Sequence, residues 1–249
     1  MRRLSLPFAV VAVVLVLTAC DEGRGGPVLV SPLPPGSTLP SETSQPAPSV
    51  TPTLLPELPA GVPASYDEDV PGSDIPQEAL IPAGSELSNR WMADTDAGEV
   101  IVVAYFLPGG DPFVQARGFV EWRRSEGAVP PWTPVFGLDR AKRDGVLGFD
   151  GVVGDVTSDG SHDLVLQEAT GGSGACGTWR IIDLAAAVQL WTKMLCDARI
   201  DLSIDPVGLS ITEAVYARDD PHCCPSDFRT TVLVYRDGRG FERDPSASG

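Results

Sequence analysis

Basic residues are scarce in this chain of 249 residues. Lys and Arg total 18 against 34 Asp and Glu, which gives a formal net charge of −16. A nucleic acid is therefore not expected as a partner, because its phosphate backbone would be repelled.

Familiar catalytic patterns are also missing. The sequence has two His, His162 and His222, and neither lies beside an obvious acid–base partner set. The run Gly171-Gly172-Ser173-Gly174-Ala175-Cys176 is not G-x-S-x-G, since Ala175 stands where the last Gly would be. We therefore name no catalytic residue and favour a protein that is not an enzyme.

Long helices and a second long apolar run are not indicated either. The chain contains 26 Gly and 24 Pro, which together make one fifth of its residues and favour turns and short strands over a helical bundle. Beyond residue 20 no apolar run reaches the 18 residues that a spanning helix needs.

The N-terminus reads as an export signal. A positive start, Met1-Arg2-Arg3, precedes an almost wholly apolar run over residues 4–19. This run ends in Leu17-Thr18-Ala19-Cys20, which resembles the bacterial lipobox. The resemblance implies a lipoprotein signal peptide over residues 1–19 and a palmitate-type lipid on Cys20, which anchors the chain on the outer, extracytoplasmic face of the cell membrane. The alternative is an ordinary signal peptide followed by a chance Cys.

Residues 20–84 predict a disordered tether. Thirteen of the 24 Pro lie between residues 21 and 80, mixed with Ser, Thr and Gly, and no period of 2 or 3.6 is visible. Such a segment buries too little apolar surface to offset its ordering entropy and favours extended polyproline conformations.

Residues 85–245 predict an all-β extracytoplasmic domain. The run over residues 100–107 is β-branched and aromatic, as in a buried strand. A short helix is open over residues 137–148 and a helical turn over 183–191. Further strands are expected over residues 119–124, 132–136, 164–169, 178–184, 188–195, 209–217, 230–235 and 240–243. Short strands joined by tight turns imply an antiparallel meander, in a partial, β-propeller-like sheet.

One loop carries a metal-ligand pattern. Acidic residues recur at positions 1, 5 and 9 of the run that begins at Asp155, and Gly160 at position 6 permits a sharp turn. Hard cations such as Ca²⁺ take oxygen ligands from loops of this kind. The candidate ligands are the side chains of Asp155, Thr157, Asp159 and Asp163 and the carbonyl of Ser161.

This loop resembles the calcium loops of FG-GAP or VCBS repeats, which occur in the blades of integrin-type β-propellers. The resemblance covers residues 154–168 and implies a structural Ca²⁺, weakened by Thr157 where tight sites more often have a carboxylate or Asn. Only one such loop is present, whereas a closed propeller repeats its blades. In the alternative reading the Asp side chains bond local N–H groups and form a metal-free turn.

Four Cys remain after Cys20, and an even number in an exported domain suggests disulfides. If residues 178–184 and 188–195 form a hairpin, Cys176 and Cys196 lie side by side at its open end and pair. The neighbours Cys223 and Cys224 would then be left with each other. Cross pairings between the two sets stay open, as does metal binding by His222, Cys223 and Cys224.

Strand counting predicts which loops share an end of the sheet. The strands recognised above place the Asp loop and residues 221–225 at one end, and Cys176 and Cys196 at the other. The shared end is then the candidate face for a ligand or partner. The Trp residues, including Trp122, Trp132, Trp179 and Trp191, fit a β core better than a sugar-stacking surface.

The folded part also resembles a group of lipoproteins of GC-rich Gram-positive bacteria, through its GDVTSDGxxDL loop, GGSGxCGTW segment and HCCPS loop. This resemblance implies an address and a fold but no activity. The preferred function is a lipid-anchored surface module that binds an extracytoplasmic protein or glycan, with a possible structural Ca²⁺ as its cofactor. The alternatives are a cell-envelope hydrolase that uses carboxylates and a thiol- or metal-handling protein that uses Cys223 and Cys224.

Overall fold

The computed structural model describes residues 53–54, 58–107, 116–141, 144–170, 175–221 and 224–247. The predicted signal peptide, the lipobox Cys20 and most of the predicted tether lie outside these ranges. In the described part, no helix has the length and apolar character needed to cross a membrane.

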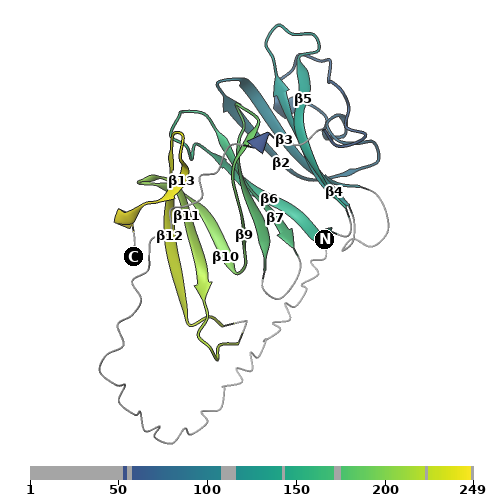
Figure 1. Ribbon diagram of the computed structural model, residues 1–249. Helices are drawn as coiled ribbons and strands as arrows, with labels where there is room; N and C mark the ends of the chain where they lie inside the picture. The colour runs from purple at the N-terminus through teal and green to yellow at the C-terminus, as the bar shows by residue number, and fades with distance from the viewer. Residues whose placement is uncertain are drawn as a thin grey trace, which may run out of the picture. The chain divides into compact units, whose positions relative to one another are not determined.

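Within these ranges the strands form three antiparallel sheets, and each has four strands from one continuous stretch of chain (Figure 1). Apart from β1, which pairs with β9, neighbouring strands in each sheet are consecutive in sequence, so the predicted all-β meander is confirmed. We call the sheets N-terminal, middle and C-terminal. The N-terminal sheet contains β2 Glu86–Thr95, β3 Gly98–Phe106, β4 Arg117–Arg124 and β5 Trp132–Arg140; the middle sheet contains β6 Val146–Gly154, β7 Asp163–Thr170, β8 Gly177–Asp183 and β9 Val188–Leu195, with β1 Thr53–Leu54 paired to β9; the C-terminal sheet contains β10 Ala198–Ile204, β11 Val207–Val215, β12 Asp227–Arg236 and β13 Gly240–Arg243.

The middle sheet lies between the other two and is covered on both faces. One face contributes side chains such as Leu164 and Leu166 to a core shared with the N-terminal sheet. The opposite face contributes Val165 and Ile181 to a core shared with the C-terminal sheet. This alternation explains why β7 is apolar at successive positions, since a strand buried on both faces needs no polar side.

The N-terminal sheet also has both faces covered. Its side chains Val100, Val102 and Ala104 pack toward the middle sheet, while those between them face a third core. That third core is completed by residues 62–81, which carry the short 3₁₀ helices η1 Gly72–Asp74 and η2 Gln77–Ala79.

This covering segment shifts the start of the folded domain relative to the predicted boundary. Residues 58–84 fall in the predicted tether, yet Ile75, Leu80 and Ile81 are at most 3% exposed and pack against Trp122 and its neighbours. The folded region therefore extends N-terminal to the predicted boundary at residue 85. The few large apolar residues between the prolines supply the burial that the composition as a whole does not indicate.

Four strands have no counterpart in the sequence prediction. They are the two-residue β1 and the longer β2, β6 and β10. Residues 137–140 end β5 and residues 146–148 begin β6, so the described residues of 137–148 are largely strand rather than helix. Between β8 and β9, residues 184–187 form a turn in which the Asp183 Oδ1 accepts from the N–H groups of Ala185 and Ala186, each at 2.8 Å.

The overlooked strand β10 changes which loops lie together. Residues 216–226 join β11 to β12 beside Asp197, whose carboxylate accepts from Tyr216 Oη at 2.7 Å and whose carbonyl accepts from Ala214 N at 3.1 Å. Asp197 directly follows Cys196, so the described residues of this loop lie at the same end of the sheets as Cys176 and Cys196, away from residues 155–162. The prediction that the two loops share an end is wrong, because the additional strand β10 places the β11–β12 loop at the opposite end of the sheet from the one expected.

Candidate functional site

The Asp loop joins the first two strands of the middle sheet. Residues 155–162 leave β6 at Gly154 and return at Asp163, the first residue of β7. The tight return uses two residues in the left-handed region, Ser158 at φ 63° and Gly160 at φ 88°.

Asp163 is the buried anchor of this loop. Its side chain is 1% exposed, and its Oδ2 accepts from Val156 N at 3.0 Å, Thr157 N at 3.2 Å and Thr157 Oγ1 at 3.1 Å. Its Oδ1 is also buried but has no hydrogen-bond partner among the described residues, and the same holds for the buried Ser161 Oγ. An unpaired buried oxygen costs free energy, so binding a proton or a cation at this carboxyl would stabilise the folded protein.

The carboxylates of Asp155 and Asp159 accept hydrogen bonds from backbone N–H groups of the same loop. Asp155 accepts from Ser158 N at 2.6 Å and from Gly160 N at 3.0 Å, while Asp159 accepts from Ser161 N at 2.8 Å. These are the local bonds of the metal-free turn that the sequence left open. Among the described residues, no three acidic, His or Cys side chains converge on a common point.

The electrostatics of Asp163 follow from burial and from its neighbours. Burial raises its pKa from 3.8 to about 7, the hydrogen bonds from Val156 and Thr157 oppose this shift, and the charges of Asp183 and Asp159 raise the pKa further. Asp183 lies directly opposite Asp163 in the β7–β8 register. The charged form of Asp163 is therefore disfavoured unless a cation compensates it.

A second buried acid lies between the N-terminal and middle sheets, and the sequence analysis overlooked it. Glu121 on β4 is fully buried and pairs with Arg123 at 3.0 Å, but its Oε2 has no partner. Burial raises its pKa from 4.5 to about 8, Arg123 acts in the opposite direction, and Asp183 raises it further. The one available signal was a charged residue at an inward position of an otherwise apolar strand.

The Cys prediction is confirmed for one pair. Cys176 and Cys196 form a disulfide that joins the ends of β8 and β9, so the cross pairings are wrong. Cys224 is exposed, whereas His222 and Cys223 lie outside the described residues. Their pairing and any metal binding by them stay predictions.

The other candidate residues have structural roles. His162 Nδ1 lies 2.7 Å from the backbone oxygen of Asp94, which joins the Asp loop to the C-terminal end of β2. Trp122 and Trp132 donate their indole N–H groups to Leu80 O at 2.9 Å and Val70 O at 3.0 Å. The Trp residues named from the sequence are all buried in the apolar cores, as predicted, while Ser173 lies outside the described ranges.

Comparison with known proteins adds no family to this geometry: no protein-family profile, curated protein or solved structure matches the chain. The function has to be argued from the residues themselves.

Proposed function

We propose that the chain is a lipid-anchored module on the outer face of a cell membrane, where it binds or scaffolds without catalysing a reaction, and that residues 155–163 hold a structural Ca²⁺. The observation that carries the metal proposal is the buried Asp163, whose Oδ1 has no partner among the described residues and whose pKa is raised further by the charges of Asp183 and Asp159. A divalent cation would pair that oxygen and relieve the repulsion from Asp159 and Asp183.

The chain itself would supply the ligands from side chains and backbone. Asp155, Thr157, Asp159 and Asp163 offer side-chain oxygens, and Ser161 offers its carbonyl. Asp155 and Asp159 first have to give up their hydrogen bonds to loop amides. Because of that cost we expect weak binding, with a dissociation constant of about 10⁻⁴–10⁻³ M as in other extracellular calcium modules.

Thermal unfolding in a calcium titration tests the metal. Ca²⁺ should raise the melting temperature saturably, with a gain of about 1.4 kcal/mol at tenfold excess over the dissociation constant. Asp159→Ala should lose this response, while Asp237→Ala, which removes an exposed carboxylate from the β12–β13 turn, should keep it. A melting temperature that does not change in millimolar Ca²⁺, or that changes equally with NaCl of matched ionic strength, would overturn the proposal.

The anchor is proposed from the sequence Leu17-Thr18-Ala19-Cys20. Mass spectrometry of the detergent-extracted protein should find a chain that starts at Cys20 and carries acyl groups. Cys20→Ala should release the protein from the membrane fraction. An unacylated mature N-terminus would contradict the anchor without affecting the calcium loop.

One observation favours the hydrolase alternative. Asp150 and Asp201 line the same cavity, as a pair of catalytic carboxylates would. However, Asp201 is ion-paired with Arg199 at 2.7 Å and Asp150 accepts from Gly151 N at 2.8 Å. A general acid is normally placed in an apolar pocket free of such donors, so this pair is better suited to binding than to proton donation. The thiol alternative would be supported by two reactive thiols at residues 223 and 224.

A further inference from the structure

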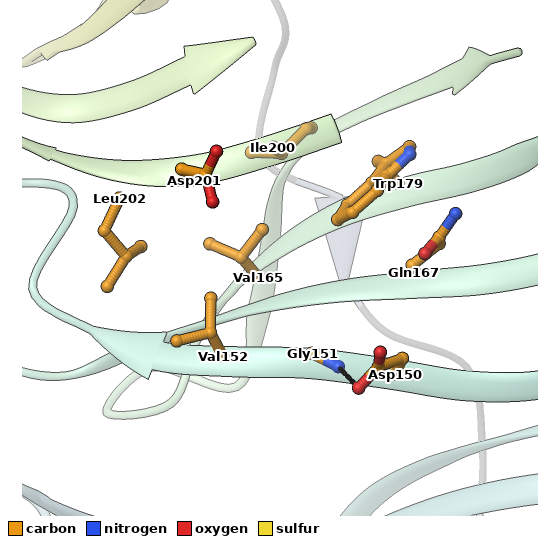
Figure 2. A pocket seen from close by; sticks show the side chains of 9 residues that line it. All are labelled: Asp150, Gly151, Val152, Val165, Gln167, Trp179, Ile200, Asp201 and Leu202. Atoms are coloured by element: carbon orange, nitrogen blue, oxygen red, sulfur yellow. Dashed lines mark hydrogen bonds between the residues drawn. The ribbon is translucent and has the colours of Figure 1, made fainter. Parts of the chain in front are cut away.

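A cavity of about 240 Å³ opens between the middle and C-terminal sheets. Figure 2 shows Asp150 and Val152 of β6 on one wall and Asp201 and Leu202 of β10 on the other, with Val165 between them. It shares no residue with the Asp loop. Its volume lies below that of most pockets for drug-sized ligands, about 300–1,000 Å³, so it suits a group the size of one side chain.

The walls of this cavity are held in place by packing. Val165 is fully buried and Ile200 is 6% exposed, because both belong to the core between the two sheets. On the far side of β6, the Gly151 carbonyl accepts from Trp91 Nε1 at 3.0 Å, which ties this strand to the N-terminal sheet. The cavity is therefore preformed, and a ligand would not have to order it.

Most polar groups of the lining are acceptors, although the buried indole N–H of Trp179, a donor, also has no partner among the described residues. Asp150 and Asp201 each use Oδ1 in the hydrogen bonds given above, and in the described chain neither Oδ2 has an intramolecular partner. Gln167 is the neighbouring amide on β7, and none of the lining residues is Lys, Arg or His. A matching ligand has to donate hydrogen bonds and carry positive charge.

Burial argues against a sugar in this place. Trp179 lines the cavity but is 8% exposed, so it offers no free ring face on which a pyranose could stack. The remaining walls are aliphatic and fit the methylene stem of a long cationic side chain. The net charge of −16 would also attract cations to the molecule.

We propose that this cavity binds the ammonium or guanidinium group of a Lys or Arg side chain on an extracytoplasmic protein partner. The Asp150 and Asp201 carboxylates supply the negative charge that attracts the head group, and the stem lies against Val152, Val165 and Leu202. This rests on the binding function proposed above and names its partner chemistry, but it does not depend on calcium.

A titration followed by NMR tests the site in the full chain, kept in detergent solution. Indole ¹⁵N labelling gives one signal for each Trp, and Trp179→Phe assigns the signal of Trp179. n-Butylammonium and n-butylguanidinium mimic the two side chains, and n-butanol is the neutral isostere. We expect saturable shifts of the Trp179 signal with both cations and at least about tenfold weaker binding of n-butanol, because the alcohol has no charge to pair.

Variants with matched charge separate the cavity from general attraction. The double variant Asp150→Asn/Asp201→Asn should lose about tenfold in affinity for n-butylammonium. Asp219→Asn/Asp237→Asn, which removes two exposed carboxylates elsewhere, should stay within about twofold. If the first double variant does not fold, Asp201→Asn alone serves, since its side chain is 45% exposed.

Each contrary outcome has a definite meaning. Equal binding of n-butanol, equal losses in the two double variants, or no saturable shift at Trp179 overturns the cation site. A blocked Gly-Lys-Gly peptide should bind as tightly as n-butylammonium; if only the free amine 1,4-diaminobutane binds, the protein partner is wrong. The titration is run in EDTA, and failure there leaves the calcium and anchor tests untouched.

Discussion

Two buried carboxyl groups, Glu121 and Asp163, are the least compensated groups in the described part of the chain. Each has one oxygen without a partner among the described residues, and the negative charge of Asp183 raises the pKa of both. By contrast, the buried Glu168 is satisfied, since it pairs with Arg140 at 2.7 Å and also with Arg180. Buried carboxyl groups are therefore of two kinds here. Glu168 is fully ion-paired, whereas Glu121 and Asp163 each keep one oxygen that can accept a proton or a cation.

Glu121 should make stability depend on pH. Its pKa rises from 4.5 to about 8 on folding, so the folded state keeps a proton that the unfolded chain releases. The resulting stabilisation is present below about pH 4.5 and is lost as pH rises through 8. Between pH 5.5 and 9, Glu121 should account for a loss on the order of 3 kcal/mol in denaturant titrations, and Glu121→Gln should remove that part of the loss, because Gln mimics the neutral acid.

Asp163, whose pKa is about 7, contributes its own loss over the same range, so the difference between wild type and Glu121→Gln isolates the part due to Glu121. Glu126→Gln is the matched control, because Glu126 is exposed. Parallel pH profiles for wild type and Glu121→Gln would show that Glu121 is already ionised in the folded protein.

At the scale of elements, the β8–β9 hairpin is closed twice. The turn at residues 184–187 joins one end and the Cys176–Cys196 disulfide joins the other. Trp191 and Leu195 of this hairpin belong to the core shared with the C-terminal sheet. Fixing the hairpin therefore also fixes one wall of that core.

Replacing both Cys176 and Cys196 with Ser should lower the free energy of unfolding by about 3 kcal/mol, the value for a loop of this length. Guanidinium unfolding under oxidising conditions measures the loss. Cys223→Ser/Cys224→Ser is the matched control, because a disulfide between adjacent residues closes a very short loop and removes little entropy from the unfolded chain. Equal losses in the two variants would mean that the first disulfide constrains nothing beyond local structure.

Sequence reasoning finds the strands with the densest apolar runs and overlooks β1, β2, β6 and β10. The run over residues 100–106 is recognisable because both of its faces are buried. β6 is broken by Gly148, Gly151 and Gly154, whereas β10 has the alternating pattern of a half-buried strand, a signal that was present in the sequence and was not used. The Asp loop was found from spacing alone, but the second cavity wall, on β10, could not be predicted without that strand.

At the scale of the whole described fold, the N-terminal segment acts as a cover for the outer face of the first sheet. Leu80 is fully buried there, and its carbonyl accepts the indole N–H of Trp122. Asp69 contributes at the rim, where it pairs with Arg124 at 2.8 Å. The segment is thus part of the fold rather than of a stalk.

Leu80→Ala should lower the free energy of unfolding by about 2–5 kcal/mol, as expected for a buried large-to-small change. Leu58→Ala, at a position 42% exposed, should cost less than about 1 kcal/mol. Thermal and urea unfolding of the two variants compare them directly. If both variants are equally mild, residues 58–84 do not contribute to the stability of the domain.

The order of the three meanders along the chain has a consequence for how the protein is assembled. Apart from β1, each sheet pairs strands that are consecutive in sequence, so its pairing can form once its own stretch of chain is available. A chain delivered N-terminus first would present the cover, then the sheet that it covers, then the central layer. The central layer would keep one apolar face open to water until residues 198–243 arrive, so an interruption of synthesis or export just before residue 198 would leave the form most prone to aggregate.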